Sequence, residues 1–89
     1  MQDKSIADFH GVSIEVEASS TFLGGAFRLI IANEKQDELK GSLGEHTLRG
    51  KLTHEGKTLP VQVVVKMGLF GTKYRLLVDG REHPIQRLK

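Results

Sequence analysis

Residues 12–31, VSIEVEASSTFLGGAFRLII, align without a gap to residues 59–78, LPVQVVVKMGLFGTKYRLLV, at an offset of 47 positions. Four of the twenty aligned pairs are identical, and ten are apolar on both sides. Each segment reads as an alternating stretch, a glycine-containing turn and a second stretch with an aromatic-Arg-Leu sequence, so Arg28 and Arg75 occupy equivalent positions. Two interpretations stay open. The match indicates an internal repeat with a pseudo-two-fold axis, or two unrelated hairpins that share the alternation of any half-buried strand.

Period-two alternation of apolar and polar residues runs through most of the chain. This pattern is typical of antiparallel strands with one buried and one solvated face. Glu55-Gly56 and Asp79-Gly80 indicate hairpin turns, and Pro84 places the last strand at a sheet edge because proline has no N–H for the ladder. We therefore predict an all-β fold of about seven antiparallel strands connected as a meander. These strands either close into a small barrel or pack as a two-sheet sandwich.

The length of 89 residues predicts one domain. Residues 1–10 show no period, and we predict that they form a loose N-terminal arm followed by a single β domain over residues 11–89. Residues 33–37 lack a sustained 3.6-residue period, so they are predicted to be a loop or a short helical turn.

The composition excludes several classes of protein. There are no cysteines, which excludes a disulfide framework and thiolate chemistry and removes the best zinc ligands. The N-terminal sequence has no apolar signal-peptide core, and the longest apolar runs are too short to cross a bilayer. We therefore expect a cytoplasmic location.

The residues that carry chemistry do not fall into a catalytic pattern. The chain has no nucleophile elbow and no Ser-His-Asp spacing, and its four histidines form neither an HxH nor an HExxH motif. A site built across loops from His10, His54 and Asp8 is the one candidate, and solvent-exposed turn histidines are the simpler interpretation. We predict that the protein is not an enzyme and expect neither a cofactor nor a metal.

Charge is distributed unevenly along the chain. Residues 1–50 carry five basic and eight acidic side chains, whereas residues 51–89 carry eight and three. If the middle strands are neighbours, their polar positions form a basic face suited to anions or nucleic acid. The other interpretation is that these side chains solvate the strands and protect sheet edges from aggregation. The basic residues on polar positions are Arg28, Lys40, Arg49, Lys51, Lys66, Lys73 and Arg75.

Two glycine-containing loops carry apolar residues at corresponding positions of the aligned segments. Phe22 and Phe70 are predicted either to contact a partner from exposed loop tips or to close the ends of the core. We predict a small non-enzymatic interaction module that binds a protein partner or a second copy of itself through Phe22, Phe70, Arg28 and Arg75. The alternative is anion or nucleic-acid binding on the basic face, through Lys40, Arg49, Lys51, Lys66 and Lys73.

Overall fold

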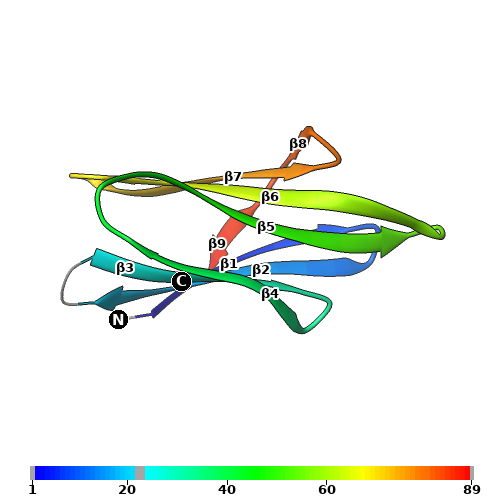
Figure 1. The fold of residues 1–89 in the computed structure, drawn as a ribbon, viewed down its shortest axis with the longest axis horizontal. Coiled ribbons are helices and arrows are strands. Elements are labelled where there is room, and N and C mark those ends of the chain that lie inside the picture. The colour runs from blue at the N-terminus through cyan, green and yellow to red at the C-terminus, as the bar shows by residue number, and fades with distance from the viewer. Residues whose placement is uncertain (1, 22–23, 89) are drawn as a thin grey trace.

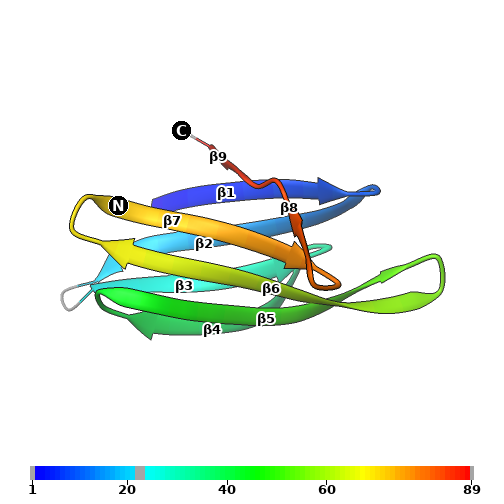
Figure 2. The ribbon, with the colours of Figure 1, turned by 90° about the horizontal axis from the view of Figure 1, so that it is seen from above.

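Antiparallel strands make up almost the whole structure. The computed structural model describes residues 2–21 and 24–88, and within them nine strands form two sheets that pack face to face (Figures 1 and 2). Sheet A has the strand order β4-β3-β2-β1-β9, and sheet B has the order β5-β6-β7-β8. The strands are β1 (Gln2–Phe9), β2 (Val12–Thr21), β3 (Gly24–Ile31), β4 (Glu34–Gly41), β5 (Gly44–His54), β6 (Lys57–Gly68), β7 (Gly71–Val78), β8 (Arg81–His83) and β9 (Gln86–Leu88).

The prediction of an all-β antiparallel meander is confirmed, and the two sheets form a sandwich. The prediction of about seven strands missed β1 and β9. Residues 1–10 were expected to be a loose arm, yet β1 pairs with β2 along its whole length and Ser5 is buried. The side chains of β1 that face the other sheet include Ser5 as well as Ala7 and Phe9, so the strand shows no clean alternation.

Residues 33–37 also differ from the prediction, because β4 begins at Glu34. The register between β3 and β4 shifts between Leu29 and Ile30, which leaves Gln36 without a cross-strand partner. Such a β-bulge places two residues opposite one and breaks the period-two pattern. The bulge therefore removes the alternation that would have indicated a strand over these residues.

Tight turns connect most neighbouring strands. Two-residue hairpin turns favour positive φ at both positions, because this backbone twist matches that of the strands. Four turns have this geometry, including the two predicted from sequence. The β6–β7 turn is different, since neither Leu69 nor Phe70 has a positive φ. The four turns are His10-Gly11, Ala32-Asn33, Glu55-Gly56 and Asp79-Gly80.

The core lies between the sheets and follows the predicted alternation. The aligned core pairs Leu29/Leu76 and Ile31/Val78 are all buried. Each buried aliphatic side chain contributes about 1.5–3 kcal/mol relative to exposure. The buried apolar side chains are Ile14, Val16, Phe27, Leu29, Ile31, Leu48, Leu52, Val61, Val63, Val65, Leu76 and Val78.

Side chains, not a strand ladder, join the sheets where β4 lies beside β5. The bulge directs Gln36 and Asp37 toward β5, where Asp37 Oδ2 accepts a 2.8 Å hydrogen bond from the backbone N–H of Arg49 and Gln36 Oε1 accepts one of 3.3 Å from that of Lys51. Gly50 permits the approach, because a Cβ at this position would lie 2.9 Å from Gln36 Cβ. No strand ladder runs from β4 to β5, so the two sheets do not close into a barrel here.

The opposite side of the sandwich is joined in the same way. The Nε2 atom of His83 on β8 lies 2.9 Å from the carbonyl oxygen of Asp8 on β1. Arg87 Nη2 on β9 donates a 2.6 Å hydrogen bond to the carbonyl oxygen of Thr72 on β7. The chain crosses from sheet B to sheet A between β8 and β9, so one short C-terminal segment serves both sheets (Figure 2).

The aligned segments occupy equivalent places in two four-stranded meanders. Residues 12–21 and 24–31 form strands β2 and β3 of sheet A, and residues 59–78 form most of the β6–β7 hairpin of sheet B. Each strand pair supplies the two central strands of its meander. A shift of 47 positions in the sequence therefore leads from a residue in sheet A to the residue in the equivalent position of sheet B.

Candidate interaction site

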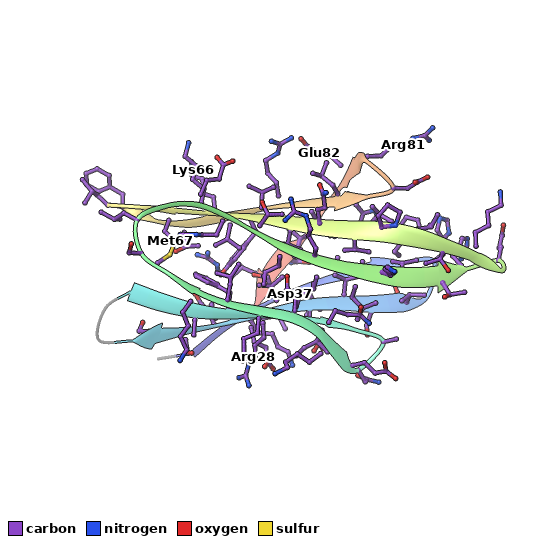
Figure 3. The ribbon with its side chains drawn as sticks, viewed as in Figure 1. Arg28, Asp37, Lys66, Met67, Arg81 and Glu82 are labelled. Atoms are coloured by element: carbon purple, nitrogen blue, oxygen red, sulfur yellow. The ribbon has the colours of Figure 1, made fainter. Side chains whose placement is uncertain are left out.

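The structure separates the predicted basic residues into two groups on opposite faces. Arg28 and Lys40 lie on the outer face of sheet A, so they cannot share a surface with the rest. Figure 3 shows Arg28 pointing away from one sheet while Lys66 and Glu82 point away from the other. The five basic residues on the outer face of sheet B are Arg49, Lys51, Lys66, Lys73 and Arg75.

The charge asymmetry along the chain becomes an asymmetry between the sheets. Residues 2–41 carry four basic and seven acidic side chains, whereas residues 44–83 carry seven and four. On sheet A most basic residues have an acidic neighbour: Arg28 lies 3.3 Å from Glu17, and Lys4 lies 3.6 Å from Glu15. The outer face of sheet A is therefore largely compensated, and the basic excess belongs to sheet B.

Lys66 and Lys73 are the most unusual charges on sheet B, because they sit directly opposite each other on β6 and β7. Like charges at directly opposed positions destabilise a sheet. Within residues 2–21 and 24–88 neither lysine makes an ion pair, whereas Arg75 pairs with Glu82 on β8. Glu45 on β5 lies opposite Lys66 on its other side. Within the described residues no acidic side chain lies opposite Lys73, so the uncompensated positive charge of the pair is centred on Lys73.

The β6–β7 turn projects two apolar side chains beyond these lysines. Leu69 is 82% exposed and Phe70 is 103% exposed, and we refer to these two residues as the β6–β7 tip. The expectation that Phe70 is an exposed contact residue fits this geometry, whereas closure of the core by Phe70 does not. Phe22 lies outside the described residues. Leu43, which is 62% exposed, lies at the same end because its neighbour Gly44 pairs with Met67.

Three hollows meet along the first half of β7. One of about 340 Å³ lies beside the β6–β7 tip, and its lining includes Lys66, Lys73 and Arg87. A second, of about 360 Å³, runs between β7 and the crossing to β9, and a third, of about 130 Å³, opens between the sheets. Thr72 lines all three, and Tyr74 lines the second and third. This half of β7 therefore borders all three hollows, which we refer to together as the concave surface.

Tyr74 closes the inner side of this surface. Its half-buried ring packs edge-on against Phe27, with centroids 6.4 Å apart, and Arg87 Cζ lies 5.4 Å from the ring centroid. Burial raises the pKa of the Tyr74 hydroxyl above its ordinary value of 10.0, and the positive charge of Arg87 offsets part of that rise.

We expect Tyr74→Phe to remove part of the alkaline loss of stability. Because the folded state holds the Tyr74 proton more tightly than the unfolded chain, this stabilisation is complete below pH 10.0 and is lost as the pH rises through the raised pKa. Urea unfolding between about pH 9 and pH 12 measures the difference. Tyr74 is the one tyrosine of the chain, so ultraviolet absorbance reports its ionisation directly. Equal alkaline losses in the two proteins would contradict the assignment.

Three histidines gather at the other end of the sandwich around Phe9. The rings of His10 and His54 stack with centroids 4.5 Å apart, and His83 contacts Phe9 edge-on at 5.5 Å. Of the three candidate residues His10, His54 and Asp8, the structure brings the two histidine rings together. Asp8 takes part through its backbone carbonyl oxygen, which contacts His83. No group of three metal-ligating side chains occurs in the part of the chain that the structure describes. The cluster packs as a small aromatic group.

Sequence reasoning missed several residues of the site at β7. Leu69 is exposed beside Phe70. Thr72 and Arg87 both line the hollows, and a hydrogen bond links the two residues. The sequence signal for Leu69 was an apolar pair in a two-residue turn, where glycine, asparagine and aspartate are usual. No local signal links Thr72 to Arg87, because their contact depends on the crossing of the chain between sheets.

No family model, curated protein or solved structure matches the chain. Over residues 2–21 and 24–88 there is also no helix long and apolar enough to span a membrane.

Proposed function

We propose that the protein is a non-enzymatic binding module that docks an acidic segment of a partner protein at the β6–β7 end of sheet B. The observation that carries the proposal is the exposed tip of Leu69 and Phe70 directly beyond the opposed Lys66 and Lys73, of which Lys73 has no acidic residue opposite it within the described residues. An apolar anchor flanked by charge is the usual division of roles at protein interfaces. Arg87 also lines this hollow, although its Nε lies 3.9 Å from Asp3 Oδ2 on β1.

The orienting role that the sequence suggested for Arg28 and Arg75 is better assigned to the lysines. Arg28 faces Glu17 and Arg75 faces Glu82, so both arginines are already compensated within the domain. Lys66 and Lys73 keep a like-charge repulsion that costs stability. An acidic partner relieves that repulsion.

Lys73→Glu tests this assignment because its two expected effects have opposite signs. The substitution turns the opposed lysine pair into an opposite-charge pair, so we expect the free energy of unfolding to rise by about 0.2–1 kcal/mol. We also expect binding of acidic peptides, selected on the immobilised wild-type domain from a displayed random library, to weaken by about tenfold or more. Urea unfolding and fluorescence anisotropy measure the two effects.

Lys51→Glu is the matched control, because Lys51 lies on the same outer face but opposes Pro60, outside the hollow at the tip. This variant should bind the selected peptides as the wild type does. Failure of the selection to enrich any peptide, or equal losses in the two variants, would contradict the proposed function.

Anion or nucleic-acid binding is the second candidate, and the basic excess on the outer face of sheet B favours it. Its weakness is the inward position of Phe27 and the half-buried position of Tyr74, because single-strand binders add exposed stacking aromatics to the basic surface. Titration with single-stranded DNA at low and raised salt distinguishes the two functions. A polyanion site should weaken steeply with salt, and Lys51→Glu and Lys73→Glu should then reduce binding alike.

A further inference from the structure

We propose that the first half of β7, residues 71–75, receives an extended acidic segment of the partner as an additional strand of sheet B. This inference rests on the proposed function and specifies how the partner is recognised. In strand addition, main-chain hydrogen bonds supply affinity, and alternate side-chain positions supply specificity.

The pairing of β7 leaves this half of its outer edge free. β6 pairs with all of β7 from Gly71 to Val78, but β8 covers only residues 76–78. In the β6–β7 hairpin Gly68 and Gly71 are the pair that flanks the two-residue turn, so Gly71, Lys73 and Arg75 bond to β6. The N–H and C=O groups of Thr72 and Tyr74 therefore point away from β6, toward the free edge.

The crossing of the chain between sheets creates this free edge. After His83 the backbone passes through Pro84 and Ile85 to β9, which pairs with residues 4–6 of β1 in sheet A. The equivalent edge in sheet A is covered, because β4 pairs with β3 from Gly25 to Ile31. One meander therefore has a complete fourth strand, and the other has only half of one.

Two polar groups beside the free edge indicate an incomplete interaction. Arg87 Nη2 donates a 2.6 Å hydrogen bond to the carbonyl oxygen of Thr72, which is the bond that an adjacent strand would supply. Ser5 is 1% exposed, and its Oγ has no hydrogen-bond partner within the described residues. Ser5 and Tyr74 line the same hollow of about 360 Å³ between β7 and the crossing. Buried hydroxyls are normally bonded, so Ser5 marks a place for a polar group.

The charges around the edge specify the chemistry of the added strand. Side chains of an added strand that lie opposite Lys73 share the outer face with Lys66. Asp or Glu at these positions compensates the lysines, since opposite charges on facing strands stabilise a sheet. The alternate side chains point toward Ser5 and Tyr74, which both line the hollow and whose hydroxyls can bond to a small hydroxyl residue such as threonine. The predicted ligand thus alternates acidic and small polar residues.

An acetylated peptide of alternating glutamate and threonine, about eight residues long, is a suitable probe beside the library-selected peptides. We expect either ligand to slow hydrogen exchange at the Thr72 and Tyr74 amides. N-methylation of alternate peptide amides should weaken binding by about tenfold or more in one register, and much less in the other, because only one set of N–H groups faces β7. A lysine-threonine peptide of the same length is the charge control and should not bind.

The matched protein variants are Thr72→Pro and Thr72→Val. Proline removes the outward N–H of Thr72 without removing a bond to β6, and proline is tolerated at such edge positions. We expect Thr72→Pro to lose binding and Thr72→Val, which keeps the N–H and the β-branched shape, to retain it. Thermal unfolding of both variants checks the fold. The N-methylation scan on wild-type protein gives an independent answer if Thr72→Pro does not fold.

The outcomes separate this inference from the function on which it rests. Acidic peptides that bind through Lys73 but tolerate N-methylation in both registers, and leave the Thr72 and Tyr74 amides unprotected, would overturn strand addition and keep the binding function. Absence of binding by both the selected and the alternating peptides would overturn both. Protected amides together with a one-register N-methylation effect would support both.

Discussion

The double variant Leu69→Asn with Phe70→Gly is expected to lose binding of selected acidic peptides by roughly 30-fold while folding at least as stably as the wild type. Truncation of an exposed aromatic anchor at an interface typically costs about 2 kcal/mol or more, which is roughly 30-fold in Kd. The fold should not suffer, because Leu69 and Phe70 are 82% and 103% exposed and contribute nothing to the core. Fluorescence anisotropy and thermal unfolding measure the two properties.

Stability should be maintained or improved because the replacement is the preferred turn sequence. The wild-type turn lacks the positive φ values that fit a two-residue hairpin, and Asn-Gly adopts them readily. Glu55→Asn is the matched control, since it places asparagine before Gly56 in the β5–β6 turn at the opposite end of sheet B. We expect this control to alter stability by a comparable, small amount and to leave binding unchanged.

Two results would contradict the role of the β6–β7 tip. A double variant that binds as tightly as the wild type would exclude the tip as an anchor. Binding of the wild type to vesicles of phosphatidylserine and phosphatidylcholine, lost in the double variant, would identify a lipid surface as the occupant in place of a protein. Apolar tips flanked by basic residues also suit anionic membranes, so the vesicle assay belongs beside the peptide assay.

Much of the fold could be predicted from the sequence because alternation and turn chemistry are local signals. The burial of Leu29, Leu76 and Val78 followed from period-two patterning, and the turn at Asp79-Gly80 followed from its dipeptide. Neither signal depends on which strands become neighbours.

The features that the sequence did not reveal depend on long-range pairing. Lys40 and Lys66 occupy equally polar positions on alternating strands, and only the division into two sheets shows that they face opposite directions. β1 was missed because its inward positions include the hydroxyl of Ser5. The bulge at Gln36 erased the period of β4.

The same limitation applies to the candidate site. Phe70 was accessible to sequence reasoning because an aromatic residue in a tight glycine-flanked turn is unusual. The free edge of β7 was not accessible, because it exists only where the chain leaves sheet B near Pro84 and continues along β1. The site at β7 is thus a consequence of topology, and its apolar tip is a consequence of local sequence.

Leu29→Ala and Leu76→Ala should each lower the free energy of unfolding by about 2–5 kcal/mol. Both side chains are fully buried on strands that have a neighbour on each side, and they occupy the same position of the aligned segments. Removal of a buried leucine side chain loses transfer free energy and leaves a cavity that the surrounding strands fill only partly. If the two meanders are energetically equivalent, the two losses should agree within about 1 kcal/mol. Urea unfolding measures both.

Ile30→Ala and Leu77→Ala are matched controls, because each lies one residue further along the same strand and the two are again related by the offset of 47. Both side chains are partly exposed on the outer faces, so each substitution should cost less than half as much as its buried neighbour. A domain of 89 residues has about 5–13 kcal/mol of total stability, so the core variants should unfold at clearly lower urea concentration. Equal costs for Leu76 and Leu77 would contradict the packing of sheet B. A large difference between Leu29 and Leu76, with both controls small, would show that the two sheets share an architecture but not an equal part in holding the core.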